Sequence, residues 1–208
     1  MVLEWLKERW LRVVVHVGAL LPLAWLIWGY GQGQLTANPI REIILRTGRT
    51  ALILLLLSLA CTPIRFLFRY GRVVRARRLL GLYAFFYALL HLAAFAWLDY
   101  GLDWVLIVDA FQQRPFVQVG LAAFLILVLL AVTSTKGWMR RLGKWWKRLH
   151  RLAYGAALLV VVHFLLLVKG DVQRPLWYGG VLVVLLLVRV PVVRRALCVI
   201  RDRIKPAS

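Results

Sequence analysis

Long apolar stretches separated by short polar segments dominate the pattern of this chain. A helix needs about 20 predominantly apolar residues to cross the hydrocarbon core of a membrane. Stretches of this kind predict an all-α integral membrane protein, a single domain over residues 1–208 built as a six-transmembrane-helix bundle. The predicted spans are 13–30, 49–68, 79–98, 116–133, 149–168 and 176–190.

Proline and asparagine refine the first two spans. Asn38 and Pro39 predict a helix start, because asparagine caps helices well and proline suits the first turn. We expect a short helix over 38–48 and expect Pro63 to kink or end the second span. The first apolar run reaches Tyr30 without a small-residue cleavage site, so we expect a retained membrane helix rather than a signal peptide.

Charge supports the membrane interpretation and predicts an orientation. The chain is 62% hydrophobic and has a net charge of +20. A soluble protein this basic would suggest nucleic acid, but these basic residues lie between apolar runs. If the N-terminus is cytoplasmic, the predicted inner segments hold 22 Lys and Arg and the outer segments hold 6. This asymmetry predicts both termini in the cytoplasm, with lipid and no nucleic acid as surroundings.

Soluble catalytic machinery is not predicted. We find no dinucleotide, nucleoside-triphosphate, zinc-protease or nucleophile-elbow motif. No predicted soluble segment is long enough for such a domain, so we expect it on another chain. Cys61 and Cys198 are too few for a disulfide framework.

Histidines within the apolar runs are candidate functional residues, because imidazole is costly to bury without a partner. His91 and His163 lie near the outer ends of spans three and five, at matched depth. Two imidazoles at one depth can hold a heme iron from both faces. We therefore expect a heme between helices three and five, with His91 and His163 as iron ligands. Two unrelated histidines bonded to backbone or hydroxyl groups are the alternative.

His150 lies thirteen residues before His163, about 20 Å nearer the predicted cytoplasmic side. The positions at matching depth on span three are Arg77 and Arg78, so a second heme would lack an obvious second ligand. His150 is open to several roles: a weaker iron ligand, a proton carrier for a quinone, a partner of a flavin or heme propionate, or an interfacial histidine. His16 has no depth-matched partner and is expected to be structural.

Four segments together resemble a known family. They are RRLLGLYAFFYALLHL (77–92), QRPFVQVG (113–120), LAVTS (130–134) and RRLGKWWKRLHRLAYGAALLVVVHF (140–164). These segments are similar to the MsrQ family of heme-binding membrane subunits, found in bacterial MsrPQ protein-methionine-sulfoxide reductase systems and placed in the ferric-reductase-like transmembrane superfamily. Superfamily members with two hemes carry paired histidines on both helices, and this chain departs from them on span three.

The resemblance implies a b-type heme, FMN as a further cofactor and a place in the bacterial inner membrane. Electrons would pass from quinol or a separate cytoplasmic flavin reductase to MsrP, a periplasmic molybdenum-containing enzyme that reduces methionine sulfoxide in oxidised envelope proteins. The family's key histidines fall on His91, His150 and His163. Arginines near the histidine-bearing helices would suit the FMN phosphate or heme propionates, although the positive-inside rule alone also explains them. The best candidates are Arg77, Arg78 and Arg151.

A heme with histidine on both faces has no open position for substrate, which favours an electron-transfer subunit over a catalytic one. Two alternatives remain open. One is a quinol-oxidising cytochrome b subunit of another oxidoreductase, and the other is a small transporter without heme. A transporter is expected to show repeats, broken helices or acids at mid-membrane. None of the acids is predicted at mid-membrane, and the sequence shows no convincing internal repeat.

Overall fold

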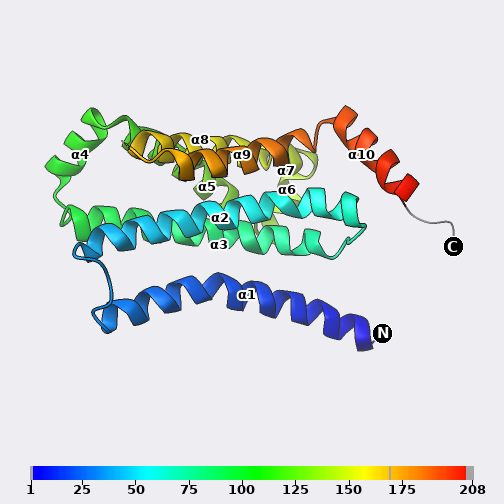
Figure 1. Ribbon diagram of the computed structural model, residues 1–208, viewed down its shortest axis with the longest axis horizontal. Helices are drawn as coiled ribbons and strands as arrows, with labels where there is room; N and C mark the ends of the chain where they lie inside the picture. The colour runs from blue at the N-terminus through cyan, green and yellow to red at the C-terminus, as the bar shows by residue number, and fades with distance from the viewer. Residues whose placement is uncertain (1, 169, 205–208) are drawn as a thin grey trace.

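The computed structural model describes residues 2–168 and 170–204, and it describes side chains over 10–168 and 170–199. These residues form helices and connecting turns, with no strand among them. The elements are α1 (Val2–Gly31), α2 (Pro39–Phe68), α3 (Val73–Ala93), the π-helix η1 (Ala94–Asp99), α4 (Trp104–Gln113), α5 (Pro115–Val132), α6 (Lys136–Leu142), α7 (Lys144–Leu149), α8 (Leu152–Leu167), α9 (Gln173–Leu187) and α10 (Pro191–Ile204) (Figure 1).

The chain is an all-α membrane protein. Five helical segments are long and apolar enough to cross a membrane, and they coincide with the first five predicted spans. The sixth predicted span falls on α9, which has only 15 residues. It reaches spanning length only together with α10, and the two are bent by 79° at the break between them. The five segments are Trp10–Gly31, Pro39–Phe68, Val73–Asp99, Pro115–Val132 and Lys144–Leu167.

Helix α2 starts as predicted but is longer than predicted. The Asn38 side chain accepts a hydrogen bond of 3.0 Å from the Arg41 N–H, and Pro39 opens the helix. The helix then continues for 30 residues, so the expectation of a separate short helix over 38–48 is wrong. Pro63 lies inside α2 and does not end it.

The continuation of α2 past Pro63 has a physical explanation. Proline has no N–H, so Pro63 cannot donate to the carbonyl four residues earlier, that of Leu59. The guanidinium of Arg189, which follows α9, donates a hydrogen bond to this carbonyl. A second hydrogen bond joins Arg189 to the Tyr154 hydroxyl on α8. Arg189 therefore replaces the bond that the proline removes and ties α2 to α8 and α9.

Two helix pairs form the centre of the bundle. Helix α2 packs along α3, and α5 packs along α8, with further contacts joining the pairs (Figure 1). Leu52, Leu59, Tyr87, Ala156 and Leu182 are among the most buried core residues. The two pairs thus carry the helices on which His91 and His163 lie.

Helix α1 lies on the outside of the α2/α3 pair. The Tyr87 hydroxyl of α3 donates a 2.7 Å hydrogen bond to the Ala19 carbonyl. His16 Nδ1 lies 2.6 Å from the Tyr83 hydroxyl, and the two rings meet edge to face. Thus His16 links α1 to α3.

The two ends of the bundle differ. Helix α1 begins, and α10 ends, at the end where α2 joins α3 (Figure 1). The opposite end carries η1 and α4. Helix α4 lies within the predicted outer loop 99–117 and is capped by Asp103, whose side chain accepts from the Val105 and Leu106 N–H groups at 2.9 and 3.2 Å.

Candidate functional site

A cavity of about 380 Å³ lies between the two helix pairs, near the α4 end of the bundle. Apolar side chains from α2, α3, α5 and α8 make most of its wall. Helix α4 contributes Trp104, Ile107, Val108 and Phe111 to this wall. The volume is within the range of about 300–1,000 Å³ typical of small-molecule and cofactor sites.

His91 and His163 face each other in this cavity. His91 is in the last turn of α3, directly before η1, and His163 is on α8. The centres of the two rings are 6.1 Å apart and their planes are nearly perpendicular, at 89°. The structure therefore brings together the two histidines that depth matching paired. Short π-helical segments such as η1 are frequent at functional sites.

Each of the two rings is held by a backbone carbonyl. His91 Nδ1 lies 2.8 Å from the Ile44 carbonyl oxygen, and His163 Nδ1 lies 2.6 Å from that of Phe116. A carbonyl can only accept, so Nδ1 is the protonated nitrogen in each neutral ring. The lone pair is then on Nε2. This arrangement, with one nitrogen donating to backbone, is typical of histidines that bind metals through the other nitrogen.

A glycine lies against each ring. A Cβ built on Gly48 would lie 2.9 Å from His91 Nδ1, and one built on Gly120 would lie 2.7 Å from His163 Nδ1. Real Cβ atoms essentially never approach this closely, so with any larger residue either the imidazole or the helix would have to shift. The two glycines allow α2 to approach the His91 ring and α5 to approach the His163 ring.

Each histidine, with the carbonyl and the glycine that lie against its ring, forms a unit that we call a histidine holder. The two holders have the same spacing: the carbonyl comes 47 residues before the histidine, and the glycine follows the carbonyl by four residues. One holder belongs to the α2/α3 pair and the other to the α5/α8 pair. This local repeat was not predicted from the sequence. Its signal was the equal spacing of glycine and histidine in two apolar helix pairs.

The separation of the rings fits one shared metal ion. A metal held at about 2 Å by one nitrogen of each ring leaves about 1 Å per side of the 6.1 Å separation, close to the distance from an imidazole's centre to its ring atoms. Perpendicular rings do not conflict with this, because each plane can contain the metal–nitrogen axis. The donor set of two neutral imidazoles in an apolar cavity suits an iron porphyrin.

His150 has a different environment. It ends α7 and does not line the cavity. Its Nε2 lies 3.4 Å from the Ser134 hydroxyl and its Nδ1 lies 3.2 Å from the Trp146 carbonyl, while its ring stacks on Trp146. Among the described contacts of His150, there is no second histidine. Whereas His91 and His163 face each other, the His150 ring faces no second histidine among these contacts.

The predicted arginines lie at the His150 end and not in the cavity. Arg77 is half-buried and donates a 3.3 Å hydrogen bond to the Thr62 hydroxyl. Its charge acts on both His150 and Arg189. Arg78 and Arg151 are exposed. Thus Arg77 is close to His150, as expected, whereas Arg78 and Arg151 have exposed side chains on the adjoining helices.

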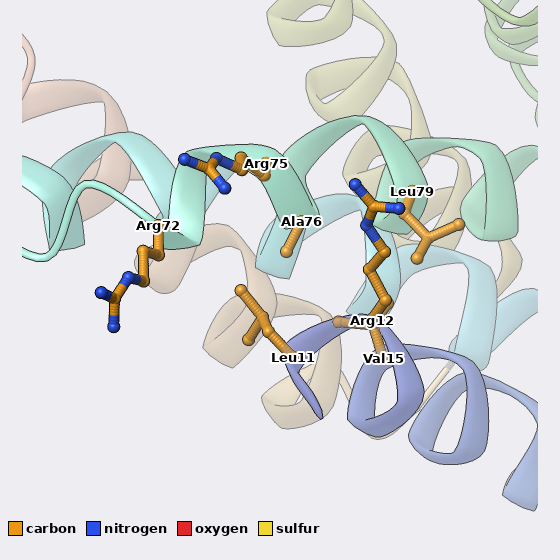
Figure 2. A pocket seen from close by; sticks show the side chains of 7 residues that line it. All are labelled: Leu11, Arg12, Val15, Arg72, Arg75, Ala76 and Leu79. Carbon is orange, nitrogen blue, oxygen red and sulfur yellow. The ribbon is translucent and has the colours of Figure 1, made fainter. Parts of the chain in front are cut away.

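A second cavity lies between α1 and α3 and has a volume of only about 20 Å³. Figure 2 shows Arg12, Arg72 and Arg75 around it, together with apolar side chains from both helices. A water molecule needs about 10–15 Å³ of such volume. This cavity can hold water but is far too small for an organic cofactor.

Comparison with known proteins gives the family. The family described as "Ferric reductase like transmembrane component" matches residues 47–161. A protein of Xanthomonas axonopodis pv. citri named "Protein-methionine-sulfoxide reductase heme-binding subunit MsrQ" is 50% identical over 181 residues, covering 84% of this chain and 83% of that protein. The protein of that name from Rhodospirillum rubrum is 48% identical over 191 residues, covering 91% and 92%. No solved structure matches the chain.

The region matched by the family model contains most of the site. Residues 47–161 include Gly48, His91 and Gly120 and end two residues before His163, and the longer matches to the curated relatives cover most of the chain. The identity and the coverage are both high enough to establish the relationship. The chain therefore belongs to the MsrQ family, within the ferric-reductase-like transmembrane proteins.

Proposed function

We propose that this chain is a b-type cytochrome that serves as the electron-transfer subunit of a protein-methionine-sulfoxide reductase system. His91 and His163 would hold its heme iron. The observation that carries the proposal is the pair of rings 6.1 Å apart, each with Nδ1 bonded to a backbone carbonyl. The names of the relatives, which are heme-binding subunits of such systems, support it.

The chain's residues suit this role in three respects. Ile44 and Phe116 fix the tautomer of the ligands, and Gly48 and Gly120 fix where the rings lie. Held by these two histidines, a heme would supply single-electron transfer rather than a binding position for substrate. The apolar wall around the rings limits access of water, which favours electron transfer over reaction with solvent.

The proposed direction of electron transfer rests on the proposed topology. We propose an inner-membrane protein with both termini in the cytoplasm, supported by the 22-to-6 distribution of basic residues and by the common end at which α1 begins and α10 ends. The cavity then lies nearer the periplasm. The acceptor would be an MsrP-like molybdenum reductase in the periplasm, and the donor would be quinol or a cytoplasmic flavin reductase.

The His150 end would receive the electrons. We propose that it binds FMN, with Arg77, Arg78 and Arg151 available to the phosphate. Arg77 supports this, because its half-buried guanidinium has a neutral partner, Thr62, and no ion pair among the described residues. Guanidinium groups bind phosphate oxygens strongly.

We assign proton transfer, rather than primary iron ligation, to His150. The Ser134 hydroxyl donates to the Leu130 carbonyl at 2.7 Å, so its oxygen is left to accept from His150. The Trp146 carbonyl can accept from the other nitrogen. A proton on either nitrogen therefore finds an acceptor, which suits a residue beside a quinol or flavin.

The test of the proposed function is spectroscopic. His91→Ala and His163→Ala should each abolish the absorbance and electron paramagnetic resonance signals of a six-coordinate low-spin heme. His16→Ala is the matched control, because His16 bonds Tyr83 outside the cavity. Normal six-coordinate heme in both cavity variants would refute the ligand assignment. A heme that never re-oxidises on addition of MsrP would refute the assigned acceptor.

A further inference from the structure

Arg49 is the cationic residue in the wall of the large cavity. It follows Gly48 on α2. Among the described residues that line the cavity, only Arg49, His91 and His163 carry titratable side chains, and none is acidic. Hydropathy alone does not distinguish Arg49 from any other arginine near a span end.

No group of the described chain neutralises Arg49. Its half-buried side chain makes no hydrogen bond, ion pair or ring contact with the residues that the structure describes. The acid nearest in sequence on α2 is Glu42, which pairs with Arg46 and accepts from the Thr36 N–H. The charge of Arg49 is therefore uncompensated by protein on an apolar wall.

An unpaired guanidinium in such a place is costly, because burial removes water without supplying another partner. Carboxylates are its strongest common partners and bind it through two parallel hydrogen bonds. The heme that we propose for this cavity brings carboxylates of its own, the two propionates of the porphyrin. A porphyrin held by His91 and His163 would share the cavity wall with Arg49.

We propose that Arg49 binds a propionate carboxylate of the heme, an inference that rests on the proposed function. Arg49 is adjacent in sequence to Gly48, which lies against the His91 ring, so one turn of α2 would position both His91 and a propionate. Arg77, Arg78 and Arg151 do not line the cavity and are not available for this contact. In the opposing arrangement Arg49 extends to a lipid phosphate, and a porphyrin without free carboxylates separates the two.

The test compares two porphyrins that differ only in their carboxylates. Heme-free full-length protein in detergent would be titrated with heme b and with its dimethyl ester, and binding would be followed by the six-coordinate absorbance. Wild type should bind heme b about tenfold to hundredfold more tightly than the ester, the effect of a hydrogen bond to a charged group. Arg49→Leu should bind both equally, through weaker binding of heme b.

Arg46→Leu is the control. Arg46 lies on the same helix but pairs with Glu42 and does not line the cavity, so this variant should keep the wild-type preference. Arg49→Lys keeps the charge but loses the two-pronged geometry, so it should keep part of the preference. Because the readout is a ratio between two ligands on one protein, a general loss of stability cannot imitate the result.

Three outcomes would count against the inference or the function in different ways. Equal binding of heme b and its ester by wild type would overturn the propionate contact and leave the histidine ligands intact. A preference that survives in Arg49→Leu would also overturn it and would favour a lipid-facing role for this arginine. A wild-type protein that forms a six-coordinate spectrum with neither porphyrin would overturn the proposed function itself.

Discussion

Replacing Gly120 by alanine tests whether the two histidine holders set the binding site. The added Cβ would lie 2.7 Å from Nδ1 and 2.8 Å from Cε1 of His163, whereas ordinary contacts begin at 3.4 Å. The ring, or α5, must therefore move by about 0.7 Å to remove the overlap. A binding geometry has to be held within about 0.5 Å, so this displacement exceeds what the site can absorb.

The expected loss follows from that overlap. Overpacking of a tight contact costs about 1–3 kcal/mol. Changes in groups that orient metal ligands typically reduce affinity by about tenfold to hundredfold. We therefore expect Gly120→Ala to weaken heme binding by about that factor. Gly48→Ala should be milder, because its Cβ would lie 2.9 Å from His91 Nδ1 and needs a shift of only about 0.5 Å.

The assay is titration of heme-free protein with heme b, followed by the absorbance of the six-coordinate form. The control is Gly155→Ala on α8, the helix that carries His163, since a Cβ at Gly155 meets nothing within 4 Å. Alanine favours helix by up to about 1 kcal/mol over glycine, so this control should fold at least as well as wild type. Equal heme affinity of Gly120→Ala and Gly155→Ala would refute the role of the glycine.

Three further predictions concern the rest of the bundle. His150→Ala should keep the low-spin heme spectrum but slow heme reduction by quinol or by a flavin reductase; a loss of heme equal to that of His91→Ala would instead make His150 a primary ligand. Arg189→Leu should lower the free energy of unfolding by about 1–3 kcal/mol, because it leaves the Leu59 carbonyl unpaired beside Pro63. An unfolding temperature equal to that of wild type would show that this bond contributes nothing. A reporter fused after Ser208 should be active only as a cytoplasmic fusion, and periplasmic activity would reverse the topology.

The elements that depend on local sequence could be predicted. Five spans follow from apolar runs, and the start of α2 follows from Asn38 and Pro39. The pairing of His91 with His163 also follows, because helical rise converts sequence position into depth. In each case the determining residues lie within one helix, or at equal distances from two helix ends.

The elements that depend on distant residues could not be predicted in this way. Pro63 does not end α2, and the Leu59 carbonyl that it leaves without a helical donor accepts from Arg189, 126 residues later in the chain. Hydropathy windows average over α9 and cannot show the 79° bend that follows it. The close approach of Gly48 to the His91 ring and the place of Arg49 in the cavity wall depend on which helix lies opposite α2. A single sequence does not give that neighbour.

Different contacts set the position of each histidine ring and the distance between the two rings. Each ring is held within its own helix pair, by a carbonyl and a glycine of the partner helix. The 6.1 Å between the rings depends instead on contacts between the pairs, chiefly α3 with α5 and α2 with α8. A heme bound by both histidines would bind only when the two helix pairs are packed together, and it would stabilise that packing through mass action. Changes within a holder should therefore alter heme affinity directly, whereas changes between the pairs should alter affinity and bundle stability together.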